Sequence, residues 1–199
     1  MKSLSFLALL VLAWFAYQKL NPPLVYPPGV LIAAAPVQSD PLPNEATFDC
    51  GPFHLLPLAQ FALEARVLHR KIYRYDRQAA LAPVDLAVGW GPMSDQRVLD
   101  QLRISQSARF FWYEWKGVPP LEPNEIVTHA TNLHLIPSDD AIAARCKALR
   151  AGELIHLSGK LVQATGPGIG TWRSSLNRTD SGNGACELVW VEELEELRR

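Results

Sequence analysis

The chain has 199 residues, of which 48% are hydrophobic and 20% are charged, and its formal net charge is −1. This length suits one globular domain and is short for two. A net charge so near zero gives no general electrostatic field for holding a polyanion, so we expect no nucleic acid partner.

The first twenty residues contain a long apolar run. SLSFLALLVLAWFAY, residues 3–17, has no charged residue, and Lys19 follows it. As a helix, residues 3–20 would rise about 27 Å, close to the roughly 30 Å hydrocarbon core of a bilayer. The sequence therefore predicts a membrane anchor over residues 1–20, with a cleaved signal sequence or a buried core helix as the alternatives.

The distribution of basic residues predicts the orientation of this anchor. Lys2 precedes the apolar run, whereas residues 20–39 contain neither lysine nor arginine. Because positive charge favours the cytoplasmic side, we expect a single-pass inner-membrane protein with a cytoplasmic N-terminus and an exported, periplasmic C-terminal domain.

Residues 21–44 include seven prolines. Proline removes backbone donors and blocks regular helix, so this segment should run extended, as a semi-rigid spacer. The apolar GVLIAAA inside it, residues 29–35, is expected to pack on the domain. A compact β-rich domain then occupies residues 45–199.

In the first half of that domain, apolar residues alternate with polar ones over about residues 59–75, which predicts a long strand. Residues 84–90 read as a buried strand. Residues 94–103 read as a helix with Ser94 as its N-cap, and residues 104–115 as a strand with apolar side chains on both faces.

The second half of the domain is again predicted to consist mainly of strands. THATNLHLIPSDD, residues 128–140, predicts a strand running into a helix that Ser138 caps. A strand over 153–164 and a turn at 166–170 follow. The last elements expected are a hairpin of 172–179 with 185–193 around Asn183-Gly184, and a helical tail over 193–199.

These elements predict an α+β protein, mainly antiparallel β, with about two inserted helices and an N-terminal transmembrane helix. The sheet would form a partly open small barrel or a curved sheet. An oligonucleotide-binding-type barrel is one candidate, but strand order does not follow from the sequence.

Four segments, VDLAVGWGPMSD, ISQSARFFWYEW, HATNLHLIPSDD and SGNGACELVWVE, carry a resemblance. In them the chain resembles uncharacterised bacterial membrane-anchored proteins over most of residues 70–192. The resemblance implies an anchored envelope protein, and it implies no activity, ligand or catalytic residue.

The three cysteines, Cys50, Cys146 and Cys186, have no CxxC or metal-type spacing. In an oxidising compartment Cys50 and Cys186 could form a disulfide that joins the two ends of the domain. Three buried, reduced thiols are the alternative. No motif in the chain predicts a metal ion or a cofactor.

Two binding or catalytic sets stand out. Cations interleave with tyrosines over residues 66–77, a pattern that suits a glycan or an anionic headgroup unless it is a solvated strand. That set is Arg66, Arg70, Lys71, Tyr73, Arg74 and Tyr75. No nucleophile motif is present, and the polar residues that could serve as base, acid or oxyanion support are Asp85, Ser107, His129, His134 and Arg178.

The leading interpretation is a membrane-anchored envelope protein whose exported domain binds a partner or ligand without catalysing a reaction. The partner would be the membrane, another envelope protein, a glycan or an anionic headgroup. A hydrolase acting on an envelope polymer and an accessory subunit of a membrane complex are the alternatives.

Overall fold

The computed structural model describes residues 22–41, 45–177, 182 and 184–197. The strands are β1 (Val37–Ser39), β2 (Phe48–Cys50), β3 (Phe53–Ile72), β4 (Val84–Gly89), β5 (Arg103–Ser107), β6 (Phe110–Glu114), β7 (Ala130–Pro137), β8 (Leu154–Gly166), β9 (Gly170–Arg173) and β10 (Glu187–Glu196). The helices are a 3-10 turn (Gly91–Ser94), α2 (Gln96–Leu99), α3 (Pro123–Thr128) and α4 (Asp140–Ala148). This part of the chain is mainly antiparallel β-sheet with three α-helices, as the α+β prediction states.

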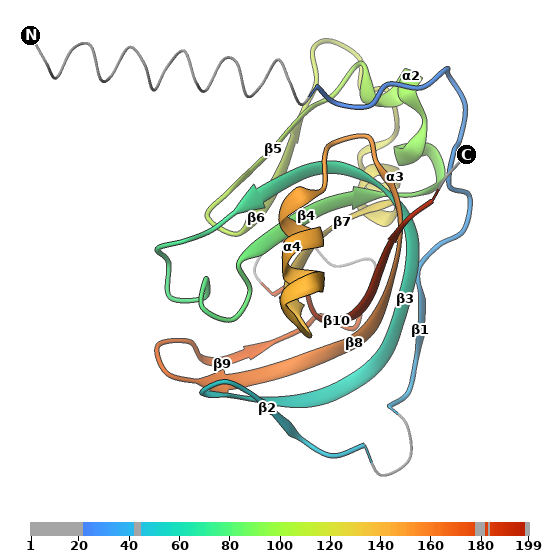
Figure 1. The fold of residues 1–199 in the computed structure, drawn as a ribbon. Helices are drawn as coiled ribbons and strands as arrows, with labels where there is room; N and C mark the ends of the chain where they lie inside the picture. The colour runs from blue at the N-terminus through green and yellow to red at the C-terminus, as the bar shows by residue number, and fades with distance from the viewer. Residues whose placement is uncertain (1–21, 42–44, 178–181, 183, 198–199) are drawn as a thin grey trace, which may run out of the picture.

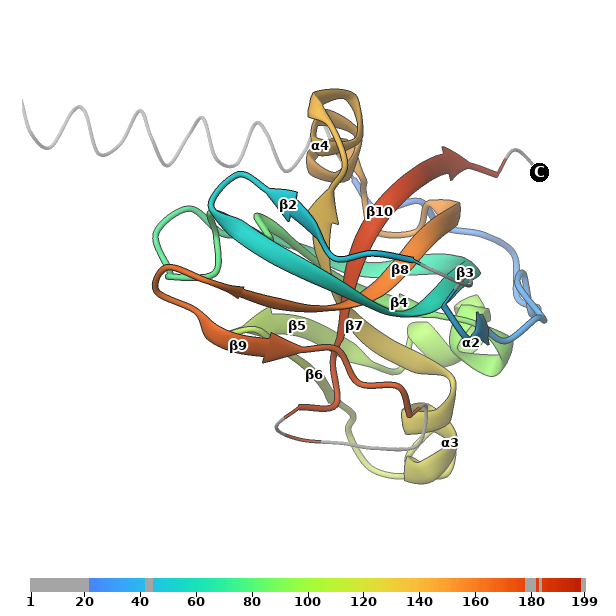
Figure 2. The same ribbon diagram turned by 90° about the horizontal axis from the view of Figure 1, so that it is seen from below.

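Five strands are paired in a closed ring (Figures 1 and 2). β3 pairs with β4, β4 with β7, β7 with β10, β10 with β8, and β8 again with β3. Only the β7–β10 pairing in the ring is parallel. Numbered along the chain, the ring runs first, second, third, fifth, fourth, and α4 connects its third and fourth strands.

The length of β3 allows the ring to close. Its first part pairs with β8 and its last part with β4, and register shifts at Pro57/Ala59 and at Val67/His69 bend it between them. Phe61, Leu63 and Ala65 alternate into the core, so the predicted long strand is confirmed, although it spans residues 53–72 rather than 59–75.

The single strand predicted over residues 104–115 is wrong. The chain reverses at Ala108 and Arg109, and β5 pairs with β6 as a two-stranded sheet. Both turn residues have positive φ, 49° and 69°, in a two-residue hairpin of the kind that usually carries Asn-Gly. Neither residue is a common turn former, so turn propensity does not predict this reversal.

Both predicted helix caps are wrong by one residue. Asp95, not Ser94, caps α2 and accepts from the Arg97 N–H, and Asp139, not Ser138, caps α4 and accepts from the Ile142 N–H. Ser94 is instead buried, and its Oγ donates to the Gly91 carbonyl. α2 is therefore a short helix within the predicted range of 94–103.

The C-terminal elements also differ from the prediction. β9 pairs with β8, and β10 pairs with β7 and β8, so the described residues contain no β9–β10 hairpin. β10 continues to Glu196 where a helical tail was predicted. In its last five residues, 192–196, the glutamates are exposed and Leu194 is buried, which is the pattern of a strand with one solvated face.

Residues 22–41, which we call the N-terminal strap, lie against the barrel. The Leu24 N–H donates to the Ala151 carbonyl at 2.8 Å, and the Gly91 N–H donates to the Ile32 carbonyl at 2.7 Å. Ile32 lies in the core, and β1 adds a strand beside β3. Gly152, at φ +91°, faces the Leu24 carbonyl so closely that any side chain there would overlap it. The segment predicted as a spacer is thus attached along its length.

Arg66 holds the strap from beneath. Its side chain is buried and donates to the carbonyls of Ser94 (3.0 Å) and Leu24 (3.2 Å) and to the Gln96 side-chain oxygen. Its guanidinium also lies 5.0 Å from the centre of the Tyr26 ring. Burial lowers the pKa of Arg66 from its ordinary value. These contacts give this basic residue of β3 a structural role.

None of the helices formed by the described residues is long and apolar enough to cross a bilayer. The anchor predicted over residues 1–20 lies outside the described residues. The transmembrane part of the fold prediction is therefore without structural support.

The disulfide considered between Cys50 and Cys186 is not formed. Cys50 lies on β2, whereas Cys186 lies just before β10. Cys146 is fully buried on α4, and burial raises the pKa of its thiol from 9.0 to about 12.

The buried Cys146 thiol predicts alkaline lability. Because its pKa is raised in the folded state, the neutral thiol stabilises the fold below pH 9, and this stabilisation is lost as pH rises toward 12. The free energy of unfolding should fall by about 1.4 kcal/mol per pH unit in that window. Urea titrations at pH 8 to 11 should show a shallower fall for Cys146→Val. Equal slopes in the two proteins would contradict this assignment.

Candidate ligand-binding site

An open cavity of about 470 Å³ lies at the end of the barrel where β4 and β10 begin. Segments far apart in the sequence form its wall. The β3–β4 connection contributes Asp76 and Gln78, the β5–β6 turn contributes Arg109, and β9 contributes Trp172 and Arg173. This convergence makes the cavity the strongest candidate for a binding site.

Arg109 is the central side chain of this wall. Its Nε and Nη2 donate to the two carboxylate oxygens of Asp76, at 2.9 and 2.6 Å. Its Nη1 donates to Asp85 Oδ1 at 2.7 Å and to the Ala82 carbonyl at 2.8 Å. The guanidinium lies 3.8 Å from the centre of the Tyr73 ring. One arginine thus joins the β5–β6 turn to the β3–β4 connection and the start of β4.

The backbone of Arg109 is held as firmly as its side chain. Its N–H donates to the Tyr73 hydroxyl at 3.0 Å, and its carbonyl accepts from Asn132 Nδ2 at 3.1 Å. The Cys186 thiol approaches the same carbonyl at 3.9 Å. Burial raises the pKa of Tyr73, so its hydroxyl stays neutral at ordinary pH. These bonds stabilise a backbone conformation that a non-glycine residue rarely adopts.

Asp85 and His134 lie behind this arginine as cross-strand neighbours of β4 and β7. His134 Nδ1 is 2.9 Å from Asp85 Oδ1, although the approach lacks the alignment of a hydrogen bond. Both side chains are buried, and the His134 ring packs 4.8 Å from Trp172. Neither His134 Nδ1 nor Asp85 Oδ2 has a hydrogen-bond partner among the described residues. Both of these atoms are buried, so this unused hydrogen-bonding capacity lies behind the wall of the cavity that His134 lines.

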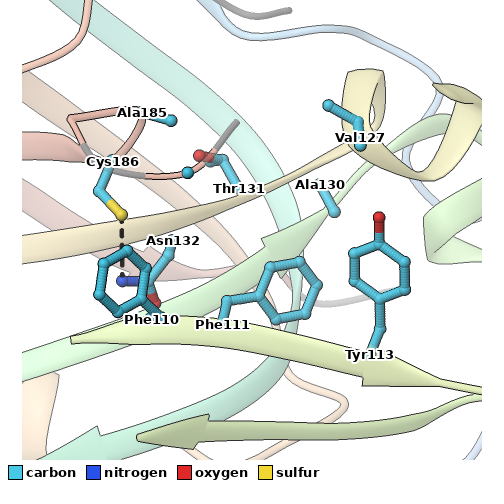
Figure 3. Close-up of a pocket in the computed structure, with 10 residues that line it drawn as sticks. Phe110, Phe111, Tyr113, Val127, Ala130, Thr131, Asn132, Ala185 and Cys186 are labelled. Atoms are coloured by element: carbon cyan, nitrogen blue, oxygen red, sulfur yellow. Dashed lines mark hydrogen bonds between the residues drawn. The ribbon is translucent and has the colours of Figure 1, made fainter. Parts of the chain in front are cut away.

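A second cavity of about 130 Å³ adjoins the first, and Phe110 and Cys186 line both. Figure 3 shows Phe110, Phe111 and Tyr113 projecting from β6 toward β7. Asn132 donates to the Cys186 sulfur at 3.8 Å across this space. Its aromatic lining connects the β5–β6 sheet to the barrel.

The structure unites only part of the predicted catalytic set. Asp85 and His134 meet beside the cavity. Ser107 is exposed on β5, and His129 caps α3 at the other end of β7, its Nδ1 2.8 Å from the Glu125 carbonyl. Arg178 lies outside the described residues. A catalytic cluster of the predicted composition is therefore not assembled by the four described members.

The predicted basic and aromatic set is also divided. Arg66 is buried beneath the strap, and Tyr73 stacks under Arg109. Lys71, Arg74 and Tyr75 are exposed, and Arg70 is half-buried. The division arises because the bulge at Val67/His69 shifts the alternation and because β3 ends at Ile72. Only the exposed members remain available to a ligand.

Sequence reasoning missed Arg109, Asp76 and Trp172 as site residues. Arg109 stands between a serine-rich and an aromatic stretch, and nothing near it indicates a turn. A possible signal was that arginine interrupts an otherwise apolar run at residues 108–112. Among the described residues, no cluster of three or more His, Cys, Asp or Glu side chains could hold a metal ion.

Comparison with known proteins found no matching family model, no matching curated protein and no matching solved structure. The function must be inferred from this site and its chemistry.

Proposed function

We propose that this chain is a membrane-anchored envelope protein whose barrel binds amino-sugar units of an envelope polysaccharide. The observation that carries the proposal is the cavity itself, in which the Trp172 indole adjoins the buried Asp85–His134 pair. An aromatic wall with a few convergent polar groups is the usual composition of a small-ligand site.

The side chains around the cavity suit a sugar better than an apolar ligand. An indole offers a flat apolar surface to a pyranose ring, and planar polar groups bond its hydroxyls. Gln78, His134 and Arg173 supply such groups here. Arg173 could also pair with a carboxylate such as that of N-acetylmuramic acid.

The topology of the ring supports this class of ligand by analogy. Five-stranded Greek-key barrels of the oligonucleotide/oligosaccharide-binding kind use the loops after their first and fourth strands to bind ligands. The cavity here lies between the corresponding loops, which follow β3 and β8. The analogy concerns fold alone, so the chemistry of the cavity must decide between the two ligand classes.

Electrostatics favour a saccharide over an oligonucleotide. Arg109, the central cation of the cavity, is already paired with Asp76 and Asp85. The whole chain has a net charge of −1. Strong binding to a phosphate backbone requires many free cations that release counterions, and this cavity offers few.

The envelope part of the proposal is supported by the apolar run at residues 3–17 and by the lack of basic residues over 20–39. A reporter fused after residue 199 should be active on the exported side of the membrane. A cytoplasmic reporter signal would overturn the localisation without affecting the binding proposal.

Calorimetric titration with the disaccharide N-acetylglucosaminyl-N-acetylmuramic acid tests the binding proposal. We expect saturable binding that Trp172→Ala weakens at least tenfold, or by about 1.4 kcal/mol. Trp190→Phe is the matched control, because that indole packs against Phe48 on β2. No binding by the unmodified protein, or equal binding by Trp172→Ala, would falsify the proposal.

A hydrolase remains the second candidate because one observation favours it. The His134 imidazole lies 2.9 Å from the Asp85 carboxylate, which are the two kinds of group that a general base and its supporting carboxylate require, although they are not aligned as a hydrogen bond. If the saccharide is cleaved, shorter products should accumulate during incubation with the protein. His134→Gln should abolish this cleavage while it keeps the fold.

A further inference from the structure

The two-stranded β5–β6 sheet has one face that the barrel does not cover. Its inner face presents Ile104, Phe111 and Tyr113, which pack against the cluster around Met93 and Ile126. Its outer face carries exposed residues at alternate positions, and Trp112 is 52% exposed there. A large indole is thus presented to solvent on a rigid element.

This outer face is continuous with the cavity. Phe110 lines the cavity, and its ring centre lies 6.1 Å from that of Trp112. Alternate residues on a strand lie about 6.6 Å apart and point to the same face, so the two rings are neighbours on the outer face of β6. An aromatic surface therefore leads from Trp172 inside the cavity, past Phe110, to Trp112 outside it.

Polar groups flank this aromatic surface. Ser107 is paired with Phe110 and Ser105 with Trp112 across the sheet, and both serines are exposed. Beyond Trp112 the surface ends at the exposed ion pair of Arg103 with Glu114. Hydroxyl groups beside aromatic rings again match the alternating apolar faces and hydroxyl edges of a sugar chain.

We propose that the ligand is a polymer, and that units following the one in the cavity lie over Phe110 and Trp112 on the outer face of β5–β6. This inference rests on the proposed function, because the occupant of the outer face is the continuation of the saccharide held at Trp172. The β5–β6 sheet thereby selects chains over single units. A short ligand fills the cavity alone and leaves Trp112 uncovered.

The test compares two lengths of one saccharide by calorimetry. The probes are the N-acetylglucosaminyl-N-acetylmuramic acid disaccharide and its tetrasaccharide repeat. We expect the tetrasaccharide to bind at least tenfold more tightly, and we expect Trp112→Ala to remove most of this gain while leaving disaccharide affinity within twofold. Val118→Ala, at a residue that is 85% exposed beyond the sheet, is the control and should keep the gain.

The outcomes separate this inference from the function on which it rests. If the disaccharide binds and the longer chain gains nothing, or if Trp112→Ala keeps the full gain, the outer face is not a subsite and the cavity keeps its proposed role. If neither saccharide binds, both proposals fail. Because Trp112 is half-exposed, its removal should leave the thermal unfolding midpoint nearly unchanged, and a variant with a large shift would be replaced by Trp112→Gln.

Discussion

Replacing Arg109 with methionine is expected to lower the free energy of unfolding by about 3–5 kcal/mol. The reason is that the change leaves the Asp85 carboxylate without its cation. Asp85 is fully buried, and Arg109 is the cation that pairs with it at 2.7 Å. Asp76 is partly exposed and should contribute less, because water can replace its partner. Urea denaturation at pH 7 measures the effect.

Two further variants make this prediction specific. Arg173→Met removes an exposed arginine from the same cavity and should change stability by less than about 0.5 kcal/mol. Arg109→Met combined with Asp85→Asn should be less destabilised than the sum of the single changes, because the second change removes the charge that the first leaves unpaired. Simple additivity would mean that the ion pair does not hold the turn.

Replacing Arg66 with methionine should release the N-terminal strap and lower the free energy of unfolding by about 2–4 kcal/mol. Two backbone carbonyls and the Gln96 side-chain oxygen would lose a charged donor in a buried place. The strap should then become the first site of cleavage in limited proteolysis. Mass spectrometry of the early fragments would place cuts within residues 22–36.

Arg70→Met is the matched control for the strap. Arg70 is a half-buried arginine of the same strand, and its side chain has no hydrogen bond or ion pair in the described part of the chain. This variant should stay within about 0.5 kcal/mol of the unmodified protein and keep its cleavage pattern. If both variants behave alike, the buried contacts of Arg66 do not secure the strap.

Periodicity predicted the fold wherever one side of a strand is buried. The strands around residues 59–75, 84–90 and 153–164 were found from alternating or continuous apolar residues, and the structure confirms them. The sequence does not predict that the ring closes, because closure depends on bulges in β3 that let this strand pair with two neighbours. Nothing in a single sequence marks which strand will bend in this way.

Errors in the prediction concentrate where tertiary contacts override local preference. Ala108 and Arg109 form a tight turn without glycine or asparagine because four side chains fix the Arg109 guanidinium and backbone. The predicted site is incomplete for the same reason. Asp85 and His134 were nominated for their residue type, but the arginine that joins Asp85 to the cavity wall was hidden inside an apparent strand.

The attachment of the strap fixes the distance between the cavity and the end of the barrel from which the chain leaves. The Leu24 N–H bonds to Ala151 and the Leu197 N–H bonds to Leu154, so both ends of the described chain leave the barrel where β8 begins. The cavity lies toward the other end of β8, which spans 13 residues, or roughly 40 Å of strand. A surface holding the residues before Pro22 would therefore meet one end of the barrel while the cavity faces outward. A protein attached in this way would reach polymer at one distance from that surface, whereas a domain on a flexible linker would reach polymer over a range of distances.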